Sequence, residues 1–213
     1  MQFDIGIQVF YFVVLIFSII IHEVAHGWAA LALGDQTAKR AGRLTLNPLP
    51  HIDPIGSILV PLLGVLSPAH MLFGWAKPVP YNPYNLRNQR WGEAFVAVAG
   101  VATNLLLAVI FGLIARYTAG AGMTTFASAA GIIALVNLSL GFFNLIPIPP
   151  LDGFTVIRGI LPYRYAMAFR TFEARFVQGG ILTLVVFLFI FSYFFSGPFS
   201  SLIRYVFTLL VGQ

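Results

Sequence analysis

The stretch IGIQVFYFVVLIFSIIIHEVAH, residues 5–26, joins an apolar segment long enough to cross a bilayer to two histidines and a glutamate. Residues four apart project from one face of a helix, so His22 and His26 can present two imidazole nitrogens to one tetrahedral metal ion. Glu23 then lies beside the ion, where its carboxylate can take a proton from a water molecule that zinc activates. Alternatively, the three side chains merely end a transmembrane helix, but three ionisable groups on one turn are costly there without a partner or metal. The stretch therefore predicts a zinc hydrolase site inside a membrane.

Composition places the whole chain in a membrane. Of its 213 residues, 59% are hydrophobic and 9% are charged, which is too apolar for a soluble domain, and we predict one membrane-embedded domain over residues 1–213. The chain has no cysteine, which excludes disulfides, thiolate nucleophiles and cysteine zinc ligands. The net charge is +5 and the pI about 9.8. The basic residues form no patch with interleaved aromatic residues, so nucleic acid is not an expected partner.

The basic residues indicate the orientation in the membrane. They gather in two loops, which the positive-inside rule places in the cytoplasm. One loop follows the first apolar span and the other follows the third; they contain Lys39, Arg40, Arg43, Lys77, Arg87 and Arg90, and Arg158, Arg164, Arg170 and Arg175. We therefore expect a multi-pass protein of the cell membrane, with its N-terminus outside and its active site near the cytoplasmic side. The first segment is not expected to be a signal peptide, since Asp4 stands where basic residues are required and cleavage would discard the histidines.

Apolar runs of about 20 residues predict an all-α polytopic bundle of about five to six transmembrane helices. The strong spans are expected at Ile5–Leu33, Ala94–Tyr117, Thr125–Ile146 and Phe176–Phe195. Leu202–Val211 is too short to be expected to cross. Pro54–Trp75 is apolar but interrupted by glycines and prolines. A re-entrant segment there would bring the end of the third strong span to the same face as His26, so we expect a small re-entrant or β-loop element between the first and second strong spans, buried against protein or lining a wet cavity.

Asp152 is the expected third metal ligand. A catalytic zinc usually has three protein ligands and one open position. Asp152 follows an apolar helix and three prolines, which end that helix and let the carboxylate point back into the bundle from an extended segment. It could also cap the helix that begins near Phe154. Two imidazoles, one carboxylate and an open position favour a single Zn²⁺ ion.

These residues together resemble the site-2 protease family of intramembrane zinc metalloproteases. The resemblance covers about residues 12–160 and combines His22-Glu23-Val24-Ala25-His26 with Asn144, Pro147 and Leu151-Asp152-Gly153. A further helix is similar to the family's Gly-x-x-x-Asn helix, and a loop is similar to its membrane-associated β-loop: Gly100-Val101-Ala102-Thr103-Asn104, and Leu72-Phe73-Gly74-Trp75 followed by Lys77-Pro78-Val79-Pro80. Larger members carry a PDZ or CBS domain, so a compact member is expected.

The resemblance implies a metalloendopeptidase that hydrolyses a peptide bond in or near a transmembrane segment of a membrane-protein substrate. Carried over by motif, His22, His26 and Asp152 bind zinc, and Glu23 is the general base and later the proton donor. Two alternatives remain open: a zinc-binding pseudoprotease that traps membrane helices, and a metal transporter. The intact Glu23 argues against the first, and the single ligand cluster in the sequence argues against the second.

Two asparagines are candidates for substrate binding or transition-state stabilisation. Asn104 could donate a hydrogen bond to the developing oxyanion. It could instead join close-packed helices, with Gly100 permitting their approach. Asn144 could support the bend of the chain or bind the substrate backbone.

Gly74 is a third candidate because it lies in the segment Met71–Val79. An unwound transmembrane substrate could add to this segment as an edge strand. The segment could otherwise be an interfacial loop anchored by aromatic residues at the bilayer surface. The loop histidines His51 and His70 could each be an additional metal contact or a pH gate, but loop histidines near an interface are usually solvated side chains, and this is what we expect.

Overall fold

The computed structural model describes residues 5–59, 76–88 and 91–212. Within these ranges every regular element is a helix, and four helical stretches are long and apolar enough to span a membrane. They are α1 (Ile5–Ala32), α4 (Gly92–Gly120), α5 (Thr124–Asn144) and Val185–Val211, which combines most of α8 (Gly180–Ile190) with η4 (Phe191–Phe195) and α9 (Ser196–Val211). The prediction of an all-α fold is confirmed for the described residues, and the four apolar helices agree with a multi-pass membrane protein.

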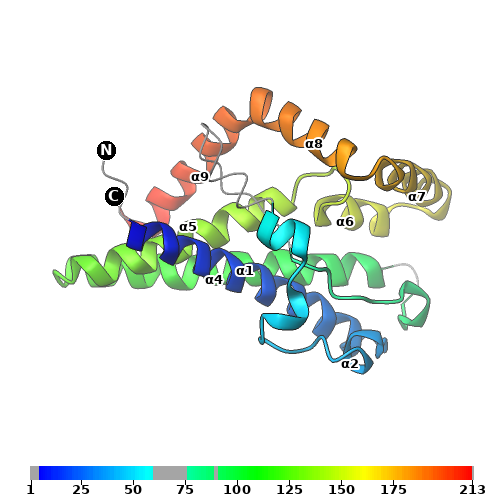
Figure 1. The fold of residues 1–213 in the computed structure, drawn as a ribbon, viewed down its shortest axis with the longest axis horizontal. Helices are drawn as coiled ribbons and strands as arrows, with labels where there is room; N and C mark the ends of the chain where they lie inside the picture. Colours follow the sequence, from blue (N-terminus) through cyan, green and yellow to red (C-terminus); the bar gives the residue numbers. More distant parts are fainter. Residues whose placement is uncertain (1–4, 60–75, 89–90, 213) are drawn as a thin grey trace.

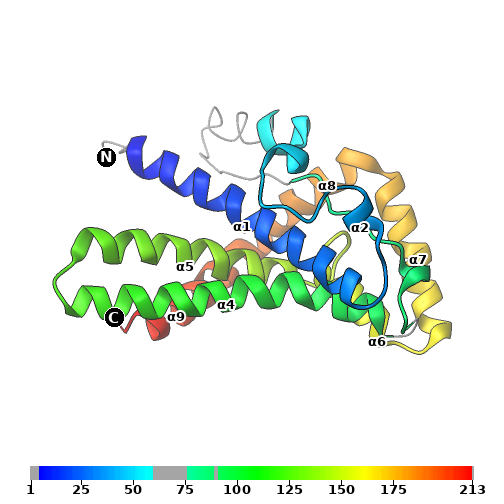
Figure 2. The same ribbon diagram turned by 90° about the horizontal axis from the view of Figure 1, so that it is seen from below.

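Helices α1, α4 and α5 form the centre of the bundle (Figures 1 and 2). Helices α4 and α5 are antiparallel, and the turn between them uses Gly122 with φ of 77°, a backbone conformation that residues with a Cβ rarely adopt. Helix α1 packs across both. Because α1 and α5 end where α4 begins, the segments after α1 and α5 meet at one end of the bundle (Figure 2). This is the arrangement that brings the histidine motif and the Asp152 segment together.

Small residues allow α9 to pack closely on the opposite face of α4 and α5. One cluster joins Ala108, Leu138 and Ile203, all at most 5% exposed. A second cluster, about two helical turns away, joins Ala115, Ala130 and Val211. Alanine at these contacts lets helix backbones approach, which is how helices associate when lipid offers no hydrophobic driving force.

The fourth span differs from the prediction of Phe176–Phe195. Phe176 belongs to the preceding helix α7 (Tyr163–Gln178), and the chain turns at Gly180, whose φ is 59°. The apolar helix then continues to Val211, so Leu202–Val211 is the end of this span and not a separate short segment. Pro198 does not break it because it falls in the first turn of α9, directly after the π-helical turn η4, where its missing N–H costs little.

The span count and the re-entrant element are not settled by these residues. Four candidate spans lie in the described ranges, against the five to six predicted. Of Pro54–Trp75, only the π-helical η2 (Pro54–Leu59) is described, and residues 60–75 lie outside the described residues. Of the expected β-loop, residues 76–80 are described and form no strand. The remaining short elements are α2 (Thr37–Arg40), η1 (Leu49–His51) and η3 (Pro83–Asn85).

Asp35 fastens the end of α1 to the loop that leads into α4. Its fully buried carboxylate accepts hydrogen bonds from Thr37 N and Oγ1 (3.1 and 2.6 Å), Asn82 N (2.7 Å) and Asn85 Nδ2 (2.8 Å). Burial alone would raise the pKa of Asp35, but these donors outweigh it and hold the pKa below its usual value of 3.8. The loop is thereby held against the helix that carries the histidines.

Helix α6 (Asp152–Ile160) packs against the beginning of α4, and α7 covers α6. Gly159 allows this approach, since a Cβ there would lie 2.8 Å from the backbone of Ala94. Phe154 stacks on Phe169 with ring centroids 5.0 Å apart. A charge cluster completes the contact: Glu93 pairs with Arg158 at 3.4 Å and with Arg170 at 3.1 Å, and Arg158 also pairs with Glu173. This packing fixes the helix whose first residue is Asp152.

Candidate metal centre

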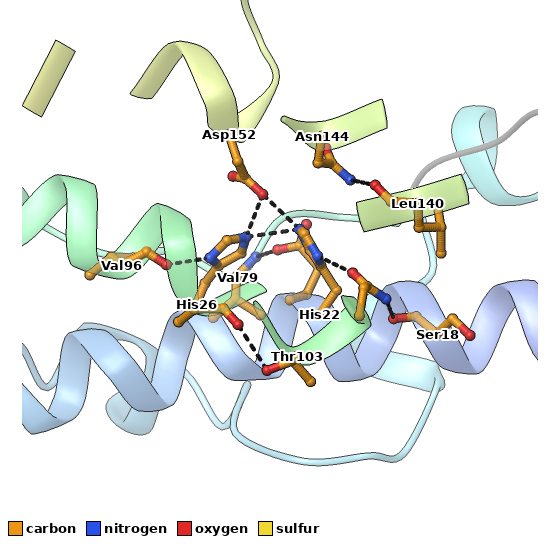
Figure 3. Close-up of polar contacts among 12 residues, drawn as sticks. Ser18, His22, His26, Val79, Val96, Thr103, Leu140, Asn144 and Asp152 are labelled. Carbon is orange, nitrogen blue, oxygen red and sulfur yellow. Dashed lines mark hydrogen bonds and ion pairs between the residues drawn. The ribbon is translucent and has the colours of Figure 1, made fainter. Parts of the chain in front are cut away.

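Three of the predicted site residues converge on one point. Nε2 of His22 and Nε2 of His26 lie 2.9 Å apart, and Oδ2 of Asp152 lies 3.0 Å from the first and 3.3 Å from the second (Figure 3). His22 and His26 come from α1, one turn apart, and Asp152 from the start of α6. Among the described residues this is the one group of three or more metal-ligating side chains. The sequence prediction that residues 126 positions apart would meet is reproduced by the fold.

The hydrogen bonds of the two imidazoles leave both Nε2 atoms directed inward. Nδ1 of His22 lies 2.5 Å from Oδ1 of Asn104, and Nδ1 of His26 lies 2.7 Å from the carbonyl oxygen of Val96. Both oxygens accept, so each Nδ1 acts as the donor of its ring. The two Nε2 atoms and a carboxylate oxygen of Asp152 then face one another, which is the set of atoms that a divalent cation takes as ligands. The donor set therefore fits a metal ion, and two imidazoles with a carboxylate suit zinc.

Asn104 belongs to a buried polar network that orients His22. Its Nδ2 donates to Oδ1 of Asn137 at 2.9 Å, and Nδ2 of Asn137 donates to Oγ of Ser18 at 2.9 Å. Asn104 and Asn137 are both at most 1% exposed. The network joins α1, α4 and α5, in agreement with the predicted role of Asn104 between close-packed helices. The oxyanion hypothesis gains no support from these contacts, because both polar atoms of the Asn104 amide are bonded within the protein.

Sequence reasoning missed Ser18, Asn137 and the Val96 carbonyl. Asn137 lies seven residues before Asn144, near the middle of an apolar helix, and a buried amide there requires partners. That requirement was the available signal. The sequence alone did not identify the partners, since Ser18 and Asn104 lie on other helices.

Asp152 occupies the first position of α6 and does not cap the helix. The N-cap residue is Leu151, in extended conformation, and no side-chain cap bond is made there. The carboxylate instead points to the histidines (Figure 3). Gly153 makes this possible, because a Cβ at that position would collide with the carbonyl oxygen of Leu145 at the end of α5. The alternative role of Asp152 as a cap is therefore not adopted.

Glu23 lies beside the three converging side chains but is not one of them. Its half-buried carboxylate accepts a hydrogen bond through Oε2 from the backbone N–H of Val79, at 2.8 Å. It lines a cavity of about 510 Å³ that also contains His22, His26 and Asp152. The cavity wall is largely apolar, with contributions from α1, α4, α5, α6 and α8. A carboxylate that opens to the same cavity as a metal centre is placed for general-base chemistry.

The remaining predicted residues have mixed outcomes. Asn144 lines the cavity, but its Nδ2 donates to the carbonyl oxygen of Leu140 at 3.0 Å within α5 (Figure 3). Gly74 and His70 lie outside the described residues. His51 was expected to be solvated, and this is wrong: it is 1% exposed, and its Nε2 lies 2.9 Å from the Thr45 carbonyl oxygen. Burial lowers the pKa of His51, so its ring is neutral at physiological pH.

Tyr81 lines the same cavity close to the charge cluster at the start of α4. Burial, together with the nearby charge of Glu93, raises the pKa of Tyr81 to about 12. Its hydroxyl is therefore protonated at neutral pH and cannot serve as a base.

Comparison with known proteins gives a consistent result. A model of peptidase family M50 matches residues 117–189. The chain is 37% identical to YwhC of Bacillus subtilis (strain 168), a protein named for zinc metalloprotease activity, over 76% of this chain and 74% of that one. It is 30% identical to Rip2 of Mycolicibacterium smegmatis, also named for zinc metalloprotease activity, over 64% of this chain and 51% of that one. No solved structure was found to match.

Proposed function

The chain belongs to peptidase family M50, and from that premise we propose that it is an intramembrane zinc metalloprotease that hydrolyses a peptide bond in or beside a transmembrane segment of a membrane-protein substrate. The family membership makes it a metalloprotease of the site-2 protease type, and its apolar helices make it a multi-pass membrane protein. The intramembrane substrate, the single ion and the residue roles are the proposed part.

One observation carries the proposal: the Nε2 atoms of His22 and His26 and Oδ2 of Asp152 converge within 3.3 Å beside a cavity that Glu23 also lines. We assign the three converging side chains to one zinc ion. Zinc, when bound there, would supply Lewis acidity that activates water and polarises the scissile carbonyl. The hydrogen bonds from the two Nδ1 atoms to Asn104 and Val96 would hold the imidazoles in the tautomer and orientation that binding needs.

Glu23 would act as the general base. The Val79 N–H holds one of its carboxylate oxygens and leaves the other able to accept a proton, and Glu23 lines the same cavity as the three ligands. Having taken the proton from the attacking water, the same carboxylate would return it to the leaving amine. Glu23 is not one of the three converging ligands, and a pure metal-binding site has no need of such a group.

The cavity suits an unwound apolar segment. Its wall includes Ile19, Leu140, Phe143, Phe187 and Leu188, which would receive apolar substrate side chains and exclude bulk water. A transmembrane helix must be locally unwound there, because its amides are otherwise bonded within the helix.

Strand addition at Met71–Val79 is proposed for only part of that segment. Within Lys77–Val79 the backbone is already bonded: Lys77 N donates to the His51 carbonyl, Lys77 O and Pro78 O accept from Arg43, and Val79 N donates to Glu23. A substrate strand would have to pair with the earlier residues, which include Gly74 and lie largely outside the described residues. We also propose that the basic end of the bundle, where these segments meet, faces the cytoplasm and that the N-terminus lies outside.

The proposal is tested by cleavage of a panel of single-span membrane helices by the detergent-purified protein. Wild type is compared with Glu23→Gln, and bound zinc is measured in both. Cleavage by wild type, together with a variant that keeps zinc and loses activity, supports the protease and the general base. Stoichiometric zinc with no cleavage by either protein would favour a pseudoprotease or a transporter. Equal cleavage by both proteins would contradict the role of Glu23.

A further inference from the structure

Arg43 is a buried cation that the chemistry described so far does not use. It lies in the loop after α2 and is 8% exposed. Its Nη2 donates to the carbonyl oxygens of Lys77, at 2.6 Å, and of Pro78, at 3.2 Å. None of the ion pairs formed among the described residues involves Arg43. Burying a guanidinium against two neutral carbonyls, without an anionic partner, costs free energy. This cost suggests that the two carbonyls are held for a reason.

One peptide group connects this cation to Glu23. The carbonyl of Pro78 and the N–H of Val79 belong to the same planar peptide unit. On one side that unit accepts from Arg43, and on the other it donates to Oε2 of Glu23 at 2.8 Å. A cation on the carbonyl polarises the amide, which strengthens the hydrogen bond from its N–H to the carboxylate.

In the segment Lys77–Pro80, which we call the strap, the N–H of Val79 is the one backbone donor available to α1. Pro78 and Pro80 have no N–H, and Lys77 N is taken by the His51 carbonyl at 2.8 Å. The strap also packs directly on the catalytic helix, since a Cβ at Gly27 would lie 2.9 Å from the Val79 side chain. Displacing the strap would therefore displace the Val79 N–H, the backbone donor that holds the Glu23 carboxylate in the described part of the chain.

We propose that Arg43 is a positioning residue for Glu23, which it orients through the Pro78–Val79 peptide. The inference rests on the proposed role of Glu23 as the general base. Without Arg43 the strap keeps its Lys77 anchor but loses both carbonyl contacts, and the carboxylate loses a fixed partner. Misplacement of a catalytic group by about 1 Å can cost about 10²-fold in rate. The three metal ligands make no contact with Arg43 and keep their positions.

The test compares Arg43→Met, Arg43→Gln and Arg43→Lys with the control Arg40→Met. Arg40 is the last residue of α2, three positions before Arg43; its side chain is exposed and, among the described residues, donates to the Gln36 side chain. Three quantities are measured: kcat and KM on a single-span helix that wild type cleaves, zinc content, and hydrogen exchange of the segment Lys77–Pro80. That segment contains two exchangeable backbone amides, those of Lys77 and Val79.

We expect Arg43→Met to lower kcat by about ten- to a hundredfold with KM and zinc content unchanged, and to speed exchange in Lys77–Pro80. Arg43→Lys should recover part of kcat, and Arg40→Met should behave as wild type. Arg43→Gln removes the positive charge and shortens the side chain while keeping it polar, so it applies the same test, with the same expected loss of kcat, if Arg43→Met does not fold.

Unchanged kcat in a folded Arg43→Met or Arg43→Gln protein would overturn the inference, as would parallel loss of zinc. The proposed function fails separately, if wild type cleaves no helix or Glu23→Gln remains active.

Discussion

Gly100→Ala should empty the metal centre without unfolding the protein. Gly100 lies on α4 directly against the two histidines. A Cβ at this position would lie 2.5 Å from both Cε1 and Nε2 of His26, and 2.7 Å from Cε1 of His22. Ordinary contact begins at 3.4 Å, so the His26 ring would have to move by about 0.9 Å.

That displacement exceeds what a zinc site tolerates. Zinc–ligand distances in real sites fall within about 0.2 Å of their usual values, and the same movement would stretch the 2.7 Å bond from His26 to the Val96 carbonyl. We therefore expect zinc affinity to fall by about ten- to a hundredfold. Activity should fall by about 10²-fold or more. Alanine is the better helix former by up to about 1 kcal/mol, which offsets part of the cost of displacing the buried ring, so the metal-free protein should still fold.

The assay is competition of a zinc chelator against the purified protein, with thermal unfolding measured in parallel. Gly120→Ala is the matched control, because it makes the same change on the same helix where a Cβ would meet nothing within 4 Å. Wild-type zinc affinity in Gly100→Ala would refute the reasoning, because it would mean that the histidines are not held against α4 as described. Zinc loss in Gly120→Ala would refute it as well, since the effect would then not depend on contact with the imidazoles.

Three further predictions concern the groups around the centre. Replacing Asn104 by Leu should weaken zinc binding by about ten- to a hundredfold, because His22 loses the acceptor that fixes its tautomer; chelator competition measures this, and unchanged affinity would contradict it. Asp35→Asn should lower the free energy of unfolding at pH 7 by about 2 kcal/mol. Because the pKa of Asp35 is lowered in the fold, its contribution is present above its ordinary value of 3.8 and is lost as the pH falls through the folded pKa, so the difference from wild type should shrink below about pH 4; a difference independent of pH would be inconsistent with this. Arg158→Met removes one cation from Glu93 and should destabilise by about 3 kcal/mol, whereas the exposed Arg164→Met should be neutral, and equal unfolding temperatures for the two variants would count against the charge cluster.

The site was largely predictable because its residues carry their chemistry in local patterns. The spacing of His22 and His26 follows from helix periodicity, and Asp152 stood out because prolines end the helix before it. If Pro54–Trp75 re-enters without crossing, the first and third strong spans end on the same face of the membrane. That order of spans predicted that the histidines and Asp152 would meet. The orienting network could not be predicted in the same way, because Ser18, Asn104 and Asn137 meet only through the rotation of three helices about their axes, which nearly uniform apolar sequences do not specify.

The fold was predicted well where one long apolar run gives one helix and less well where a run is divided. The end of the third predicted span and the start of the fourth both differ from the structure. In the fourth, the Gly179–Gly180 pair begins a new helix that Pro198 then fails to end, so hydropathy alone placed the boundaries too early. The buried position of His51 was missed because the sequence of a loop that packs beside α1 does not differ visibly from that of a solvent-exposed loop.

The zinc K-edge X-ray absorption spectrum of the purified protein, recorded with its zinc stoichiometry, tests the metal centre most directly. We predict one zinc per chain with two imidazole nitrogens and oxygen ligands at about 2.0–2.2 Å. We also expect Asp152→Ala to lose the carboxylate oxygen or the ion itself. A coordination shell without two imidazoles, or wild-type zinc content and an unchanged spectrum in Asp152→Ala, would contradict the assignment of this metal centre.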